Sequence, residues 1–339
     1  MNPHDPKQGR FALVREMMEA PEAIRRMDWR AAAGLVPVAR ERGALFMTGE
    51  GSSRILPAKN SISLARRLGI RERIGCEGAR QAAEYALDDV VVFGASNSGK
   101  TREVIDLFRR LRASGHKALY GLTATPGSLL ERECARAFVL SCGEEKAVAA
   151  TKSVVEQALF YQVLVSGLDA PRQWPALLGD LAEKADIALR MEIEAPMARR
   201  IAAAETVYVA GRNDGVAEEL ALKTCEIARK KALYCEGTYV VHGVEEAMAR
   251  EDAVILVDPY EAEWEKYKEV LVDGVGLCVM AIAARPTPFP TLLIPSAPEL
   301  DTVIQLCAGW NLLVAVGLEL GIDLDRPVRA RKVGNEFVV

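Results

Sequence analysis

Short apolar runs of strand length alternate with longer amphipathic segments along most of the chain, and several of the runs end in Gly, Ser or Asp. This alternation is typical of parallel sheets that are covered by helices on both faces. The runs that predict strands are Ala44–Thr48, Val90–Gly94, Ala118–Thr123, Ala137–Ser141, Thr206–Ala210, Ala253–Val257, Leu277–Ala281 and Thr291–Pro295. The pattern therefore predicts an α/β protein with flavodoxin-like, doubly wound parallel sheets.

The predicted strands fall into two sets that match each other in order. Segments that recur at nearly constant separation are Phe46–Gly49 and Tyr208–Gly211, Cys76–Gly78 and Cys235–Gly237, and Asp89–Val92 and Asp252–Ile255. The apolar helix predicted through Tyr161–Leu164 likewise matches the one predicted through Trp310–Leu313. One match of this kind means little, but several in register favour an internal duplication. We therefore expect two tandem duplicated α/β domains.

The duplication also sets the expected domain boundaries. Residues 1–35 are predicted to form an N-terminal helical segment, 36–168 the first domain, 169–198 a linker, 199–322 the second domain and 323–339 a C-terminal tail. Three prolines flank a helical pattern in the linker, as is common in connecting segments.

Charge and cysteine usage exclude several classes of protein. The net charge is −4 and no basic run is present, so neither nucleic acid nor an anionic membrane is an expected partner. The seven cysteines are odd in number, scattered and without a CxxC pair, which argues against a disulfide framework or a zinc site. The apolar stretches are of strand length, short of the about 20 residues that span a bilayer, and no signal peptide is evident at the start. We expect a cytoplasmic protein without a metal or other cofactor.

The loop Ser96–Thr101 carries the first candidate chemistry. It follows a predicted strand and precedes a helix predicted over Thr101–Ala113, so backbone N–H groups and the helix dipole point toward any ligand there. The hydroxyls of Ser96, Ser98 and Thr101 add donors that can surround a phosphate. An ordinary N-cap and turn is the alternative interpretation. The second copy has the acidic, bulky segment Asp258–Glu263 at the matching place, so only the first domain is predicted to bind phosphate.

Residues 94–101 also satisfy the G-x-x-x-x-G-K-[ST] pattern of a nucleotide-binding P-loop. Three features disfavour an NTPase. The preceding strand-turn, Gly49–Arg54, is itself hydroxyl-rich, and the second copy keeps the strand without the loop. The best acidic strand end for magnesium, Asp258, lies in the other half of the chain. The P-loop NTPase is therefore the least favoured of the functions considered.

With these motifs in place, the chain resembles the SIS (sugar isomerase) domain family, specifically the isomerase half of glucosamine-6-phosphate synthase and the stand-alone double-SIS phosphosugar isomerases and deaminases. The segments that carry the resemblance are Gly49–Ser53, Ser96–Thr101, Glu145–Lys152, Glu219–Glu226, His242-Gly243 and Asp325–Lys332. The resemblance covers nearly the whole chain, and the order and spacing of these motifs make it specific.

The resemblance implies a role for each matching residue. The residues that would bind the phosphate and nearby sugar hydroxyls are Ser52, Ser53, Ser96, Asn97, Ser98 and Thr101, with the backbone around Val148 against the sugar. Glu226 would move a proton between C1 and C2, and Lys223, His242 and Lys332 would assist at the carbonyl and ring oxygen. The family's active site lies between subunits and takes its histidine from the neighbour, which implies a homodimer.

The same residues have other interpretations without the family. Lys223 and Glu226 are three apart and therefore lie on one face of a helix, where they could form a solvent-exposed ion pair. A glutamate beside a lysine nevertheless supplies the base and the cation that aldose–ketose isomerisation needs. His242 could be a surface histidine, although a group titrating near neutral pH suits sugar ring opening. Lys332, in the tail, could be solvated.

Departures from the family pattern bear on the substrate. The chain starts without a glutaminase half, so we do not expect it to be a complete amidotransferase alone. Thr238–His242 replaces the family's Gly-Glu-x-Lys-His, Val244 replaces a proline, and Ala150 replaces a serine. The favoured function is a phosphosugar isomerase or isomerase/deaminase that acts on a sugar phosphate such as fructose 6-phosphate or glucosamine 6-phosphate, through an enediolate or enolamine. A non-catalytic sugar-phosphate sensor, from a different class, is the second hypothesis.

Overall fold

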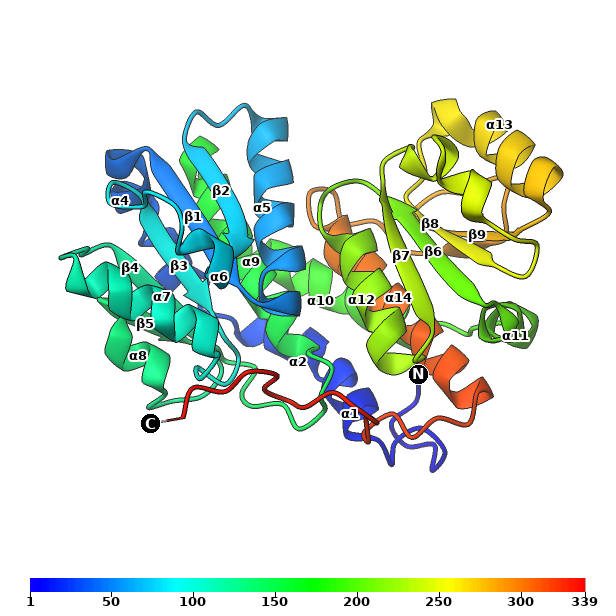
Figure 1. The fold of residues 1–339 in the computed structure, drawn as a ribbon, viewed down its shortest axis with the longest axis horizontal. Helices are drawn as coiled ribbons and strands as arrows, with labels where there is room; N and C mark the ends of the chain where they lie inside the picture. Colours follow the sequence, from blue (N-terminus) through cyan, green and yellow to red (C-terminus); the bar gives the residue numbers. More distant parts are fainter. Residues whose placement is uncertain (339) are drawn as a thin grey trace. The chain divides into compact units, whose positions relative to one another are not determined.

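Within residues 1–338, ten strands form two five-stranded sheets in which every pairing between neighbouring strands is parallel (Figure 1). The computed structural model describes residues 1–338. The chain divides into two units, each built on one sheet: a first unit of Glu22–Gly179 with the tail from Arg329, and a second unit of Met1–Pro21 with Asp180–Val328. The predicted α/β class with two parallel sheets is confirmed.

The first unit contains the sheet β2-β1-β3-β4-β5. Its strands are β1 (Ala44–Gly49), β2 (Arg73–Gly78), β3 (Val91–Ala95), β4 (Leu119–Thr123) and β5 (Arg136–Val139). Its helices are α3 (Trp29–Ala33), α4 (Val36–Arg42), α5 (Ile55–Leu68), α6 (Ala79–Ala82), α7 (Arg102–Ala113), α8 (Leu129–Glu133) and α9 (Lys152–Asp169), with a 3₁₀ turn at Gly51–Ser53.

The second unit contains the sheet β7-β6-β8-β9-β10. Its strands are β6 (Thr206–Gly211), β7 (Lys231–Glu236), β8 (Ala253–Val257), β9 (Cys278–Ala283) and β10 (Thr291–Leu293). Its helices are α1 (Ala12–Met18), α11 (Ala195–Ala203), α12 (Val216–Ile227), α13 (Trp264–Tyr267), the π-helical Lys268–Val275, and α14 (Asp301–Glu319), with 3₁₀ turns at Tyr239–Val241, Val244–Ala247 and Glu261–Glu263. The strand order repeats that of the first sheet, as a duplication requires.

The chain passes between the units within α2 (Ala20–Arg26) and within α10 (Trp174–Arg190). The segment 169–198, expected as a linker, thus consists largely of one helix. The tail belongs with the first unit because its backbone pairs with that unit, as described below. Val339, the last residue of the expected tail, lies outside the described residues.

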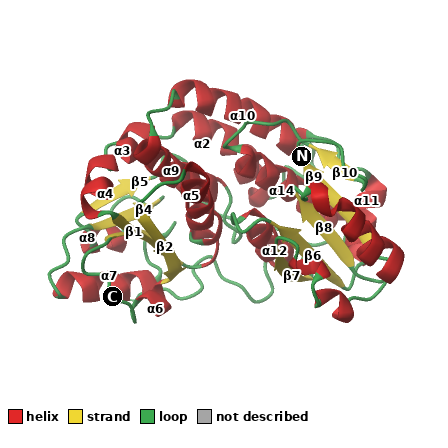
Figure 2. Ribbon diagram, turned by 90° about the horizontal axis from the view of Figure 1, so that it is seen from above, coloured by secondary structure: helices red, strands yellow, loops and turns green. Residues whose placement is uncertain are grey.

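Helices cover both faces of each sheet, as the apolar pattern predicts (Figure 2). In the first unit, side chains of α6, α7 and α8 bury one face against Phe46 and Val92. On the other face lie α5 and the almost wholly buried α9, whose Tyr161 ring packs edge-on against Phe93 at 5.6 Å. Gly94 allows α7 to approach β3, because a Cβ there would lie 2.6 Å from the Phe108 ring. This close packing fixes the loop that joins β3 to α7.

Helix α14 corrects one expectation from the sequence. We expected every long apolar stretch to be of strand length, but α14 is long and apolar enough, by length and composition, to cross a membrane. Of its most apolar window, 83% is buried inside the fold, among α11, α12 and β9. Helices buried on all sides are apolar all round, so this composition fits a core helix of the second unit.

Candidate functional site

Two hydroxyl-rich turns leave the same edge of the first sheet. Strands β1 and β3 are neighbours, and their register sets Gly49 beside Ala95. The 3₁₀ turn after β1 holds Ser52 and Ser53, and the loop after β3 is Ser96–Thr101. In doubly wound sheets, ligands bind outside the carboxyl ends of the strands, where the strand order reverses. Because β1 lies between β2 and β3, that point is here.

The loop Ser96–Thr101, called the Ser-Gly loop below, has a conformation in which two backbone N–H groups make no hydrogen bond within residues 1–338. The Oγ of Ser96 lies 2.8 Å from Oγ1 of Thr101, and the Oγ of Ser98 accepts from the Lys100 N–H at 3.2 Å. Neither the Asn97 nor the Ser98 backbone N–H donates to any residue between 1 and 338. These N–H groups lie just ahead of α7, where the helix dipole favours an anion.

An ordinary N-cap does not explain this loop. Thr101 occupies the N-cap position of α7, but its side chain makes no capping hydrogen bond and contacts Ser96 instead. Gly99 has a φ of +62°, and a Cβ on it would lie 2.3 Å from the Cβ of Ser128. The loop is therefore shaped by glycine and by its own hydroxyls, as an anion site would be.

Lys100 does not behave as a P-loop lysine. Its side chain is 51% exposed, and its ammonium lies 3.2 Å from the carboxylate of Glu336 in the tail. In a P-loop the lysine reaches the phosphates. The pairing of Lys100 with Glu336 gives the NTPase alternative no support.

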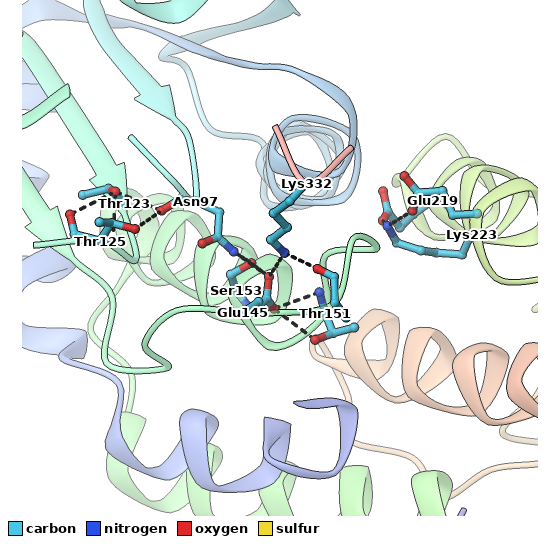
Figure 3. A network of polar contacts seen from close by, with 11 residues as sticks. Asn97, Thr123, Thr125, Glu145, Thr151, Ser153, Glu219, Lys223 and Lys332 are labelled. Carbon is cyan, nitrogen blue, oxygen red and sulfur yellow. Dashed lines mark hydrogen bonds and ion pairs between the residues drawn. The ribbon is translucent and has the colours of Figure 1, made fainter. Parts of the chain in front are cut away.

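Glu145 is the centre of a buried polar network in the first unit, and Figure 3 shows its partners gathered around it. One carboxylate oxygen accepts from the Thr151 N–H at 2.9 Å and the Ser153 N–H at 3.0 Å. The other accepts from the Ser153 hydroxyl at 2.9 Å and the Asn97 amide at 2.5 Å, with the Lys332 ammonium at 3.4 Å. Glu145 thus joins the Ser-Gly loop, the start of α9 and the tail.

The carboxylate of Glu145 is ionised although it is fully buried. Burial by itself would raise its pKa, but the Lys332 ammonium and the hydrogen bonds from Ser153 and Thr151 outweigh burial and lower the pKa. A charged group that accepts this many hydrogen bonds fixes the positions of its donors. Asn97 is therefore held in one orientation at the loop.

The tail lies along the Ser-Gly loop and α7. Phe337 donates its N–H to Lys100 O at 2.9 Å, and Arg102 donates to Asn335 O at 3.0 Å. Lys332 also donates to Ala147 O at 2.6 Å, and its side chain is 29% exposed. The alternative that Lys332 is solvated is therefore wrong. Val148, the next residue after Ala147, is half-buried.

In the second unit, α12 carries a buried lysine between two glutamates. The Lys223 ammonium is fully buried and lies 2.5 Å from Glu226 and 3.3 Å from Glu219. Burial would lower the pKa of Lys223, but the two carboxylates raise it, so the ammonium remains charged. Glu219 is fully buried, whereas the Glu226 side chain is 26% exposed. The alternative of a solvent-exposed ion pair is therefore wrong.

His242 stands apart from this pair within the second unit. It follows the 3₁₀ turn Tyr239–Val241, is exposed, and donates its backbone N–H to Tyr239 O at 3.1 Å. Across the described part of the chain, no hydrogen bond or ion pair joins its ring to Lys223 or Glu226. No group of three or more His, Cys, Asp or Glu within residues 1–338 is arranged to hold a metal ion.

Two acidic residues in these networks were not predicted as site residues. Glu145 opens the Glu145–Lys152 motif and Glu219 opens the Glu219–Glu226 motif. Glu219 could have been found from its place four residues before Lys223, which puts both side chains on one helix face. The role of Glu145 depends on a contact with a residue 187 positions away, which no local pattern signals.

Comparison with known proteins bears on the first unit directly. The family model of the SIS domain matches residues 77–167, a stretch that includes the Ser-Gly loop and Glu145. The chain carries a SIS domain. The resemblance inferred from the motifs is thereby confirmed. Within this SIS domain, β3 and α7 present the Ser-Gly loop, and Glu145 ties that loop to α9.

Similar proteins extend the likeness beyond that stretch. The glutamine–fructose-6-phosphate aminotransferase of Aeropyrum pernix is 31% identical over 211 residues, 58% of this chain and 34% of the relative. The C-terminal domain of the Francisella tularensis glucosamine-fructose-6-phosphate aminotransferase superposes with a TM-score of 0.78 at 18% identity, covering 94% of this chain and 98% of that domain. A candidate phosphosugar isomerase from Silicibacter pomeroyi superposes with a TM-score of 0.78 at 25% identity, covering 93% and 100%. The chain spans less than half the length of the first curated relatives it matches.

Proposed function

We propose that this protein is a phosphosugar isomerase, or isomerase/deaminase, that acts on a ketose or amino-sugar phosphate. One observation carries the proposal: α12 holds a fully buried, charged Lys223 against Glu226. The Glu226 side chain is 26% exposed, whereas Glu219, on the other side of Lys223, is fully buried. A carboxylate beside a fixed ammonium is suited to moving a proton next to a carbonyl group.

The proposed reaction uses these groups in sequence. The Glu226 carboxylate removes a proton from the carbon next to the carbonyl, and the electron pair moves to the carbonyl oxygen or the imine nitrogen. The resulting enediolate or enolamine is stabilised by the nearby cationic charge of Lys223. Glu226 then returns the proton to the neighbouring carbon, and the hydroxyl proton of the carbon that lost its hydrogen moves to the enediolate oxygen or the enolamine nitrogen, which completes the exchange between C1 and C2. His242 is proposed to assist ring opening, and Lys332 to act at the carbonyl.

The phosphate is proposed to bind at the Ser-Gly loop. The unused N–H groups of Asn97 and Ser98 and the hydroxyls of Ser96, Ser98 and Thr101 provide the donors. Ser52 and Ser53, from the neighbouring turn, and the backbone near Val148 are proposed to contact the sugar. The relatives' names, which refer to fructose 6-phosphate, support a hexose phosphate as the substrate.

The assembly is proposed to be a homodimer in which each subunit supplies its histidine to the other. The resemblance to the SIS family supports this arrangement. The exposed position of His242 in its own chain is consistent with it.

Replacement of Glu226 tests the proposed base. Glu226→Gln keeps the volume and a hydrogen-bond acceptor for Lys223 but cannot take a proton, so turnover of fructose 6-phosphate or glucosamine 6-phosphate should fall by about 10²–10⁴-fold or more. Protection of the protein by the same sugar phosphate in thermal unfolding should remain. Glu218→Gln, on the same helix, is the matched control. Undiminished turnover in Glu226→Gln would exclude this base, and binding without turnover in the unaltered protein would favour the sensor.

A further inference from the structure

A cavity of about 880 Å³ opens in the second unit, in a region that the proposed phosphate site does not use. Its lining comes from the end of β7, from the segment after β7, and from the turn after β8. The side chains that give it chemical character are Tyr234, Tyr239, Tyr260, Glu236, Glu263 and His242.

The cavity lies where a doubly wound sheet normally binds its ligand. In the second sheet β6 lies between β7 and β8, so the strand order reverses there as it does at β1 in the first sheet. Crevices at the carboxyl ends of the strands beside such a reversal are the usual ligand sites of this architecture. The cavity is thus the counterpart, within the second unit, of the Ser-Gly loop in the first.

The charges around the cavity make it unsuitable for phosphate. Arg212, which lies against Tyr260, and Arg285, which donates to Pro259 O, both form ion pairs with Asp258, Arg285 at 2.5 Å. Arg285 also donates to Glu261 at 2.7 Å. Glu236 and Glu263, in contrast, take part in no ion pair within the described chain. The lining therefore carries uncompensated negative charge, which repels anions and attracts cations.

The aromatic side chains supply the remaining contacts. Tyr239 is 57% exposed and Tyr260 is 36% exposed, unusually open for tyrosine rings in a hollow. The Arg212 guanidinium lies 4.3 Å from the Tyr260 ring centroid and fixes that ring from one side. Tyrosine rings pack against the C–H faces of sugars and attract cations, and their hydroxyls hydrogen-bond to polar groups. Burial and then Glu236 raise the pKa of Tyr234, whose hydroxyl donates to Arg212 O at 3.4 Å.

We propose that this cavity binds an amino sugar that carries no phosphate. Its ammonium group pairs with Glu236 and Glu263, and its ring packs on Tyr239 and Tyr260. A free amino acid fits less well, because its carboxylate would need a cation and the nearby arginines are already paired. No residue of Ser96–Thr101 lines the cavity, so glucosamine binding can be tested apart from phosphate binding, although His242 of the lining also has a role in the function proposed above.

NMR titration of the full chain with glucosamine, compared with a titration with the neutral analogue N-acetylglucosamine, tests the proposal. N-acetylglucosamine has the same ring without the charge and should bind at least about tenfold more weakly. The double variant Glu236→Gln/Glu263→Gln should lose about tenfold or more in affinity for glucosamine, and Tyr239→Ala about fivefold. Affinity for glucosamine should also fall as salt is added. These side chains are partly or fully exposed, so the variants are expected to fold.

Two controls separate this site from the phosphate site. Glu246→Gln changes an exposed glutamate outside the lining and should leave glucosamine binding unchanged. Ser98→Ala alters the Ser-Gly loop and should weaken thermal protection by fructose 6-phosphate but not glucosamine binding. Equal affinity for the two amino sugars, full affinity in the double variant, loss of glucosamine binding in Ser98→Ala, or no binding at all would each overturn the proposal. Protection by fructose 6-phosphate in the double variant reports separately on the proposed function.

Discussion

Replacing Glu219 by Gln should destabilise the protein by about 3 kcal/mol at neutral pH. Glu219 and Lys223 are both fully buried on α12, with 3.3 Å between the carboxylate and the ammonium. Glutamine has nearly the same volume and still offers a hydrogen-bond acceptor, so the substitution removes the charge and little else. The buried ammonium then keeps Glu226 as an anionic neighbour but loses Glu219.

The magnitude follows from the geometry. Two unit charges 3.3 Å apart attract by about 5 kcal/mol at an effective dielectric constant of about 20. Breaking a buried pair by removing one partner typically costs about 3–5 kcal/mol. We expect the lower end, because Glu226 stays 2.5 Å from Lys223 and because the variant no longer buries a carboxylate.

The destabilisation caused by Glu219→Gln should depend on pH in a direction that follows from the pKa of Lys223. The pKa of Lys223 is raised above its ordinary value of 10.5 in the folded protein. The stabilisation that accompanies a raised lysine pKa is fully present below the ordinary value and disappears as the pH rises through the folded value. The difference between Glu219→Gln and the unaltered protein should therefore be constant around neutral pH and should narrow above pH 10.5.

Urea unfolding followed by far-UV circular dichroism measures the effect. Glu183→Gln, at an exposed position on α10, is the control and should change the free energy of unfolding by no more than about 0.5 kcal/mol. A double-mutant cycle with Lys223→Met should give a coupling of about 2 kcal/mol, because removing both charges relieves the cost of removing one. Glu219→Gln as stable as its control, or strictly additive effects in the cycle, would refute the reasoning.

Two further substitutions test the first unit. Gly99→Ala should destabilise the protein by about 1–3 kcal/mol and weaken thermal protection by inorganic phosphate, because φ is +62° and the new methyl would lie 2.3 Å from the Cβ of Ser128. Gly115→Ala, where φ is also positive but no atom lies within 4 Å of the new Cβ, isolates the clash, and an equal effect at both positions would contradict it. Glu145→Gln should cost about 3 kcal/mol at neutral pH. Because the pKa of Glu145 is lowered, the stabilisation that its carboxylate provides is present above the ordinary pKa of 4.5 and is lost as the pH falls. The urea midpoint of Glu145→Gln should therefore fall less steeply with decreasing pH than that of the unaltered protein. An equally steep fall in both proteins would contradict this.

The apolar runs in the sequence predict all the described strands except β2 and β7, and they include the partly exposed edge strands β5 and β10. The apolar runs locate β1, β3 and β8 to within a residue or two, because buried parallel strands are apolar throughout. The edge strands β2 and β7 were not predicted as apolar runs, since most of their residues are half-buried or exposed. The sequence indicates them only through the recurring segments Cys76–Gly78 and Cys235–Gly237, which overlap the carboxyl ends of β2 and β7.

The candidate site divides in the same way between local and long-range features. The Ser-Gly loop is visible in the sequence because its hydroxyls, glycine and following helix are contiguous. The spacing of Lys223 and Glu226 predicts a shared helix face but not that the face is buried. That burial depends on α14, where Gly309 admits Leu220 so closely that a Cβ would lie 2.3 Å from it. The contact between the tail and Glu145 likewise arises only from the fold.

The central claim is that this chain moves a proton between C1 and C2 of a sugar phosphate. Incubation of fructose 6-phosphate or glucosamine 6-phosphate with the protein in deuterated water, followed by NMR of the C1 and C2 positions, measures that step directly. We expect exchange with the unaltered protein and with Glu218→Gln, and we expect exchange to be lost in Glu226→Gln although the sugar phosphate still binds. Binding without exchange in the unaltered protein would contradict the proposed isomerase chemistry and favour a sugar-phosphate sensor.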